Sequence, residues 1–352
     1  MGLFHGLNGP FARAPVSLKA DMVKLSDLPR FVFIVGAPRC GTTTLAGLLK
    51  QHPKVCFPIV KEPHFFLQHD VREFDDEALR EIVETEFLDR FYGHCRARHD
   101  TGVDGSVSYL YAPEHLLPAL RLWPDAKFVI ALRDPMTMLP SLHARLKYTG
   151  DETIEQFEDA WAAIPDRAAG KRIPRSCLEP RWLRYDEAGR FGSYVERFFD
   201  VIGRERCFVS VFDDLIADPE GQYRAMCEFV GLEPHAKTDF TPQRESRGFR
   251  HGWLQRLLKR PPRVARDYLA GKQFRQRERD LDEPLDDRIS EHIFSVRKRL
   301  LRWNRIPLEK RPIPMPVQRD IHDRLKSETD HLGRLLGRDL SHWLEVRDGR
   351  VG

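Results

Sequence analysis

The sequence predicts an α/β fold of three layers, in which helices flank a central parallel sheet. The runs FVFIVG at 31–36 and FVIAL at 128–132 are short, apolar and rich in β-branched and aromatic residues. Such runs are typical of strands buried on both faces. A third strand is expected at 207–215. Because helical patterns separate these runs, strands alternate with helices, which favours a doubly wound parallel sheet.

Length and composition indicate a globular protein. The 352 residues are 41% apolar and 31% charged, which allows a packed core beneath a charged surface. We expect a lead-in at 1–30 and one domain at 31–352. The net charge of +4 is too small to indicate nucleic-acid binding, and no nucleic-acid partner is expected.

Two regions of the expected domain have unusual composition. Residues 244–280 contain twelve basic and four acidic residues, so we expect a basic helical region, part of which closes over a bound anion. Residues 306–352 begin with a proline-rich extended segment that wraps the surface, and a pair of helices follows it. Leu325, Leu332, Leu335 and Leu336 form the apolar stripe of those helices.

The cysteines and the hydropathy pattern bear on location. The six cysteines are scattered, with no C-x-x-C pair and no zinc-ligand spacing, so a reduced compartment and no metal are expected. No run approaches the roughly 18 apolar residues of a membrane span. We therefore expect a cytoplasmic protein without an integral membrane segment.

The stretch VGAPRCGTTTL, which follows the first strand, predicts an anion-binding loop. Gly36 and Gly41 have the spacing of an ATP- or GTP-binding P-loop, but Thr42 stands where that motif has its lysine. The helix that follows begins with three threonines, 42–44, whose hydroxyls can donate hydrogen bonds to anionic oxygens. Arg39 adds a positive charge. The loop therefore fits a short anion that needs no metal better than a nucleoside triphosphate.

This loop resembles the 5′-phosphosulfate loop of sulfotransferases that use 3′-phosphoadenosine 5′-phosphosulfate (PAPS). The Pro-Arg-x-Gly-Thr-Thr form is that of tyrosylprotein sulfotransferases and many bacterial members, whereas heparan sulfate enzymes have lysine where Arg39 stands. The resemblance implies a P-loop-like fold and PAPS as the sulfonate donor. It also implies that the loop residues bind the donor: Pro38, Arg39, Cys40, Gly41, Thr42, Thr43 and Thr44.

The resemblance extends from residue 31 to about 343. LRDP with Ser141 resembles the family's 3′-phosphate site, in which Arg133 and Ser141 would hold the phosphate. Pro135 suits the first turn of the following helix. An Arg133–Asp134 salt bridge of purely structural value is the alternative. A basic flap over the nucleotide is expected to include Arg247, Gly248 and Arg250.

The stretch KEPHFF at 61–66 matches the family position of the catalytic base. Glu62 aligns with the glutamate of the glucosaminyl sulfotransferases, and a carboxylate can take the proton of an attacking hydroxyl. Pro63 favours an extended backbone, so Lys61 and Glu62 are expected on opposite sides of the chain with separate roles. Lys61 would lie nearer the sulfonate or the acceptor. His64 is a second candidate base.

Two alternatives remain open for this part of the chain. Lys61 and Glu62 could be ordinary surface charges beside a phenylalanine core anchor. In DGSVSYLYAPE at 104–114, Ser106 and Tyr109 could touch the acceptor, or the tyrosine could pack against the sheet.

The sequence thus predicts transfer of a sulfonate from PAPS to an acceptor hydroxyl or amine of a carbohydrate or small metabolite. The alternatives are a P-loop kinase-like phosphotransferase, which would need Mg²⁺ and ATP, and a non-catalytic nucleotide-binding protein. Acceptor pockets are built from variable loops, so the sequence leaves the acceptor and the oligomeric state open.

Overall fold

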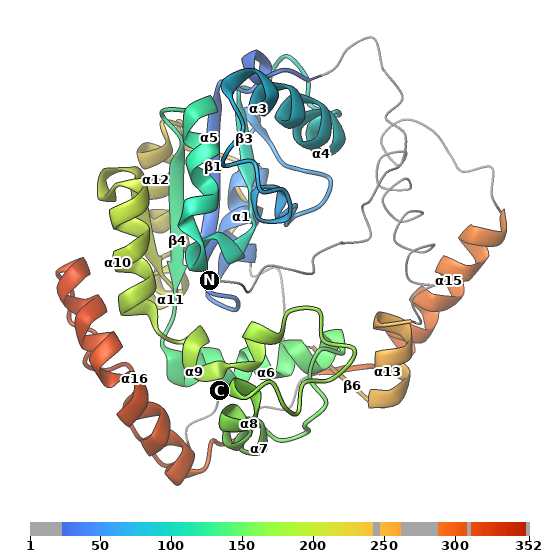
Figure 1. Ribbon diagram of the computed structural model, residues 1–352, viewed down its shortest axis with the longest axis vertical. Helices are drawn as coiled ribbons and strands as arrows, with labels where there is room; N and C mark the ends of the chain where they lie inside the picture. The colour runs from blue at the N-terminus through green and yellow to red at the C-terminus, as the bar shows by residue number, and fades with distance from the viewer. Residues whose placement is uncertain (1–22, 242–246, 262–287, 308–310, 350–352) are drawn as a thin grey trace. The chain divides into compact units, whose positions relative to one another are not determined.

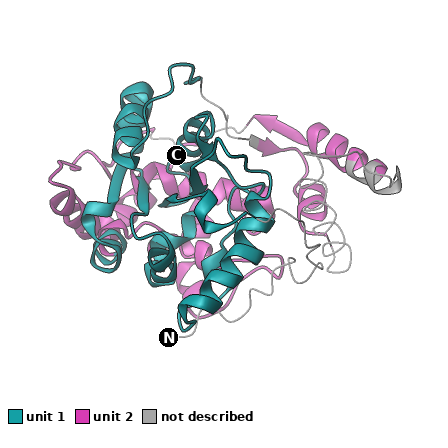
Figure 2. Ribbon diagram, turned by 90° about the horizontal axis from the view of Figure 1, so that it is seen from above, with its two compact units in different colours: residues 1–133, 194–243 teal, residues 134–193, 244–352 magenta. Residues whose placement is uncertain are grey.

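The computed structural model describes residues 23–241, 247–261, 288–307 and 311–349. These residues form two compact units, coloured separately in Figure 2. Unit 1 comprises residues 1–133 and 194–243, and unit 2 comprises 134–193 and 244–352. That residues 31–352 form one domain stays a prediction.

Unit 1 is built on a five-stranded parallel sheet with the order β2-β3-β1-β4-β5. The predicted strands are present, with bounds β1 Arg30–Gly36, β4 Lys127–Leu132 and β5 Cys207–Val211. The third is shorter than expected because α11 (Phe212–Ala217) begins where the strand ends. Two short strands were not predicted, β2 Val55–Cys56 and β3 Thr101–Asp104.

Helices cover both faces of this sheet, which confirms the α/β three-layer fold (Figure 1). On one face α1 (Thr42–Lys50) packs against β1, and α12 (Pro219–Val230) against β4 and β5. On the other face Phe33 stacks on Phe128, whose ring meets Phe198 of α10 (Phe191–Ile202). The remaining α-helices of unit 1 are α2 Phe65–Gln68, α3 Asp76–Ile82, α4 Arg90–Tyr92 and α5 Leu117–Leu122.

Unit 2 is mainly helical and includes a two-stranded antiparallel sheet, β6 Arg247–Phe249 and β7 Arg305–Pro307. Pro135 begins α6 as predicted, and Asp134 caps it by accepting a hydrogen bond from Met136 N at 2.9 Å. The expected C-terminal helix pair is a single helix, α16. The α-helices are α6 Pro135–Thr149, α7 Phe157–Ala162, α8 Ile164–Ala168, α9 Tyr185–Ala188, α13 Gly252–Lys259, α15 Arg288–Trp303 and α16 Met315–Leu336.

Short helices of other types complete the described chain. The 3₁₀ turns are Leu25–Asp27, Val107–Tyr111, Pro113–Leu116, Pro180–Leu183 and Arg204–Arg206, and Val83–Asp89 is π-helical. Of the predicted lead-in, residues 1–22 lie outside the described residues, as do 242–246, 262–287 and 308–310 within the predicted basic and C-terminal regions. No helix among the described residues has the length and apolar character needed to cross a bilayer.

Candidate active site

The threonine loop joins β1 to α1 and has the backbone of an anion cradle. Gly41 caps α1 with a left-handed backbone (φ 91°), and a Cβ there would lie 2.9 Å from a methyl of Leu215. At Gly36 a Cβ would lie 2.5 Å from the Ala131 carbonyl oxygen. Arg39 also has a positive φ, 70°. This path turns the chain sharply and aims the start of α1 at the loop, where backbone N–H groups attract anions.

Two arginines lie close to the cradle. Arg133 follows β4, donates a hydrogen bond to the Arg39 carbonyl oxygen at 3.4 Å and lies 4.5 Å from the centre of the Phe212 ring. Cys40 is buried, and burial raises the pKa of its thiol to about 12 even though Arg133 and Arg39 lower it. Cys40 is therefore a thiol that packs within the loop and has no thiolate character.

Glu62 lies between two basic side chains. Lys61 Nζ donates to its Oε1 at 2.7 Å, and His64 Nε2 lies 3.6 Å from its Oε2. Burial would raise the pKa of Glu62, but the polar contact with His64 and the charge and hydrogen bond of Lys61 outweigh it and lower the pKa to about 2. The carboxylate is thus ionised throughout the neutral range, as a proton acceptor must be.

This pairing corrects the expectation that Lys61 and Glu62 point to opposite sides of the chain. Lys61 lies in a bend of the chain, and the four methylenes of a lysine allow its ammonium group to fold back onto a neighbour. The two residues form one charged cluster with His64.

A buried support behind this cluster comes from β3 and the turn after it. Asp104, at the end of β3, accepts a hydrogen bond from Ser106 N at 2.7 Å, and Ser106 Oγ accepts one from His64 N at 2.9 Å. That bond fixes His64 in a left-handed conformation (φ 53°), which is uncommon for a residue other than glycine. Ser106 and Asp104 therefore act on the backbone next to Glu62.

Burial raises the pKa of Asp104 to about 6, although hydrogen bonds from Ser106 lower it. Tyr109 is fully buried, and its hydroxyl accepts a hydrogen bond from Phe66 N at 3.2 Å. Of the two alternatives given for this tyrosine, the structure therefore supports packing in the core. Sequence reasoning named Ser106 only as a possible acceptor contact and missed Asp104. The Asp-x-Ser spacing at the end of a strand was the available signal.

The parallel sheet places these groups along one edge. The cradle follows β1, the Lys61–Glu62 segment follows β2, the Asp104–Ser106 turn follows β3, and Arg133 follows β4. Carboxyl ends of parallel strands lie on the same side of a sheet, where ligands of open α/β folds bind. Unit 1 thus brings together the predicted donor loop, the predicted base and one predicted phosphate-binding arginine.

The other predicted nucleotide contacts belong to unit 2. Ser141 is half-buried on α6, Gly248 is buried in β6 opposite Ile306, and Arg250 is exposed. The backbone of Arg247 starts β6. The roles predicted for these residues and for Arg133 at a 3′-phosphate stay predictions.

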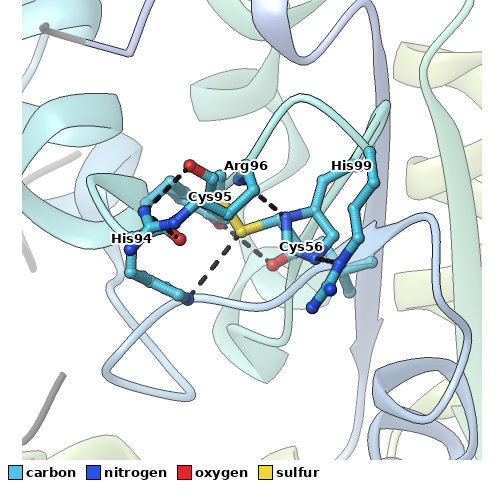
Figure 3. The surroundings of a disulfide bond; sticks show 8 residues. Cys56, His94, Cys95, Arg96 and His99 are labelled. Atoms are coloured by element: carbon cyan, nitrogen blue, oxygen red, sulfur yellow. Dashed lines mark hydrogen bonds between the residues drawn. A yellow bond between two sulfur atoms is a disulfide. The ribbon is translucent and has the colours of Figure 1, made fainter.

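The structure corrects the expectation of reduced cysteines for one pair. Cys56, the last residue of β2, forms a disulfide with Cys95, which follows α4 (Figure 3). The Cα atoms are 5.8 Å apart, within the normal range for a disulfide. Cys40, Cys177, Cys207 and Cys227 are free.

The disulfide lies near the predicted catalytic segment. Five residues separate Cys56 from Glu62, and Ile59 N donates a hydrogen bond to the Phe91 carbonyl oxygen of α4 at 3.0 Å. Cys56, His94 and Cys95 are also the one group in the described chain whose ligand atoms could hold a metal, but the disulfide uses both thiols. The prediction that no metal is needed stays a prediction.

Residues 29–236 match the model of the family described as "Sulfotransferase family". The chain belongs to the sulfotransferase family. The matched span contains the whole five-stranded sheet, the threonine loop and the Lys61–Glu62 segment.

Named sulfotransferases match the chain over about half of their own length. Carbohydrate sulfotransferase 15 of Mus musculus is 24% identical over 259 residues, and that of Rattus norvegicus is 49% identical over 258. Each match covers 60% of this chain and 45% of the relative.

A solved sulfotransferase from Alicyclobacillus acidocaldarius shares the fold. It superposes with a TM-score of 0.55 at 23% identity, covering 89% of this chain and 98% of that one. The P-loop-like α/β fold expected from the threonine loop is therefore confirmed.

Proposed function

We propose that this sulfotransferase-family chain transfers a sulfonate from PAPS to an acceptor hydroxyl or amine. The observation that carries the proposal is the P-loop-like cradle with Thr42 in the lysine position, on the same sheet edge as the ionised Glu62. PAPS, when bound, supplies an activated sulfonate. The cradle suits such an anion because Gly41, with its left-handed backbone, begins α1, where backbone N–H groups attract negative charge.

Each residue of unit 1 has a distinct proposed task. The backbone N–H groups and hydroxyls of Thr42–Thr44 hold the phosphosulfate, and Arg39 stabilises charge that develops on the bridging oxygen. Glu62 removes the proton of the acceptor as it attacks sulfur in line. Lys61, which pairs with Glu62 in the structure, is proposed to turn to the sulfonate when the donor binds. Positioning and charge stabilisation then account for most of the catalysis.

A carbohydrate acceptor is the version of this proposal that the relatives favour. The mouse and rat proteins are named carbohydrate sulfotransferases, and Glu62 stands where the glucosaminyl sulfotransferases have their glutamate. A small metabolite is the second acceptor class. No specific observation favours phosphotransfer, because Thr42 replaces the lysine that a triphosphate requires.

The nucleotide product 3′-phosphoadenosine 5′-phosphate tests donor binding. At about 100 times its dissociation constant it should stabilise the fold by about 2.7 kcal/mol, seen as a raised melting temperature. Mg²⁺ with ATP serves as the comparison ligand. A shift with Mg²⁺-ATP and none with the sulfotransferase product would overturn the proposal.

Substitution of the proposed base tests the chemical step. Glu62→Gln keeps the size of the side chain and should keep the nucleotide-induced shift. Transfer of radiolabelled sulfonate to a panel of saccharide and small-molecule acceptors should fall by roughly 10²–10⁴-fold. Glu114→Gln changes a half-buried carboxylate that is paired with Arg197, so it is the matched control and should transfer normally. Wild-type turnover in Glu62→Gln would remove this residue from the base role.

A further inference from the structure

Two helices of unit 2 expose large apolar side chains in a regular pattern. Trp253 and Leu257 of α13 are 68% and 52% exposed and lie four residues apart. Val296, Leu300 and Trp303 of α15 are also exposed, at the spacing i, i+4, i+7. Residues at these spacings share one helix face. Each helix therefore presents an apolar stripe to its surroundings and not to the core.

The two helices are joined to each other, so the stripes belong to one structural element. Arg297 Nε on α15 donates a hydrogen bond to the Leu258 carbonyl oxygen of α13 at 3.0 Å. Asn304, buried after α15, accepts a hydrogen bond from His251 N at 2.8 Å, and the His251 ring stacks on Trp303 at 5.5 Å. These contacts hold the exposed indole of Trp303 in place.

The same element carries a dense positive charge. Residues 251–261 and 295–307 together contain eight lysines or arginines and no aspartate or glutamate. Lys298, Arg299 and Arg302 are exposed and form no ion pair with a described residue. Burial and the nearby charges of Arg297 and other arginines lower the pKa of Lys259 to about 8. Arg260 of this group pairs with Asp151 at 2.7 Å, so the exposed and unpaired Lys298, Arg299 and Arg302 are the cations that can attract an anionic surface.

We propose that α13 and α15 form a docking surface for membranes containing anionic phospholipids. Helices that combine exposed Trp, Leu and Val with lysines and arginines lie in the bilayer interface, with the apolar face among acyl chains and the cations near headgroups. An anionic polysaccharide would satisfy the charges but would leave five large apolar side chains in water. The bilayer matches both properties, and this proposal does not depend on sulfotransfer.

Vesicle co-sedimentation of the full chain tests the surface. The protein should bind phosphatidylcholine vesicles that contain about 30% phosphatidylglycerol, bind pure phosphatidylcholine much less, and be released by salt. Tryptophan fluorescence should shift to shorter wavelength on binding. Absence of binding to the anionic vesicles would overturn the proposal.

Variants separate the apolar and the charged contributions. Lys298→Gln/Arg302→Gln should lower the partition coefficient roughly 30-fold, since each cation near an anionic bilayer contributes about fivefold. Trp253→Ser/Leu300→Ser should lower it at least about tenfold. Ile216→Ser, which alters an exposed apolar residue of α11 in unit 1, is the matched control and should bind as wild type. The melting temperature of each variant reports whether it is folded.

Binding of heparin, a soluble sulfated polysaccharide, distinguishes a polysaccharide partner from an anionic bilayer. If heparin binds the protein, and Trp253→Ser/Leu300→Ser leaves both heparin and vesicle binding unchanged, the surface recognises charge alone and the bilayer assignment is wrong. Loss of vesicle binding in that variant, with heparin binding retained, supports the bilayer.

Discussion

The disulfide between Cys56 and Cys95 gives a quantitative prediction about stability. It closes a loop with a sequence separation of 39 residues that contains Glu62, α2, α3 and α4. In the chain-entropy description, closing a loop of this length lowers the entropy of the unfolded chain enough to stabilise the fold by about 4 kcal/mol. We therefore expect Cys56→Ala/Cys95→Ala to lose about that much free energy of unfolding.

Urea unfolding followed by tryptophan fluorescence measures this loss. The wild-type protein in reducing agent should unfold at the same lowered urea midpoint as the double variant, and reducing agent should not alter the variant. Cys177→Ala removes a half-buried free thiol and is the matched control, which should keep the wild-type response to reductant. In the native protein, before unfolding, mass spectrometry after alkylation should find that Cys56 and Cys95 have not reacted.

Alkylation of all six cysteines in the native, unreduced protein would refute the reasoning. So would a double variant as stable as wild type. The cytoplasmic location expected from the sequence stays a prediction, and it faces the fact that disulfides persist mainly in oxidising compartments. Thiol counts on protein taken directly from cells would decide between these two expectations.

Three substitutions in unit 1 test the support of the site. Ser106→Ala removes the acceptor for His64 N, so it should destabilise the fold by about 1–3 kcal/mol and speed amide exchange of residues 61–68; Ser210→Ala, an equally buried serine, should leave that exchange unchanged. The pKa of Asp104 is raised from 3.8 to about 6, so its charge destabilises the fold above pH 6 by about 3 kcal/mol. Asp104→Asn should therefore be more stable than wild type at about pH 8, with the difference vanishing toward about pH 4, and a pH-independent difference measured by thermal unfolding would contradict this. Gly41→Ala forces a methyl group into a left-handed turn and should abolish the thermal shift with 3′-phosphoadenosine 5′-phosphate, while a normal shift would show that the loop tolerates it.

The sequence predicted the parts of the fold that have strong local signals. The apolar runs of β1 and β4 are continuous, and Pro135 marks the first turn of α6. β2 has only two residues, and β3 reads Thr-Gly-Val-Asp without an apolar run. The strand identity of β3 depends on tertiary packing, because the Phe31 ring lies where a Cβ on Gly102 would be, 2.4 Å from its nearest atom.

In the candidate site, too, the features with a local sequence signal were predictable and those that depend on tertiary contacts were not. The threonine loop was predictable because its glycines and hydroxyls are consecutive in the sequence. The support from Asp104 and Ser106 to His64 joins segments about 40 residues apart, and the disulfide joins cysteines with no motif between them. Such contacts are set by the sheet order, which places β3 beside β2. The Lys61–Glu62 ion pair depends on side-chain rotamers that a backbone argument cannot supply.

The ion pair between Lys61 and Glu62 also bears on when the acceptor loses its proton. A carboxylate with a pKa of about 2 is a weak proton acceptor. An anionic donor that attracts Lys61 would remove one of the charges that lower this pKa, so Glu62 would become more basic only after the donor has bound. On the proposed mechanism, the acceptor hydroxyl would therefore lose its proton only in the complex that also holds the donor.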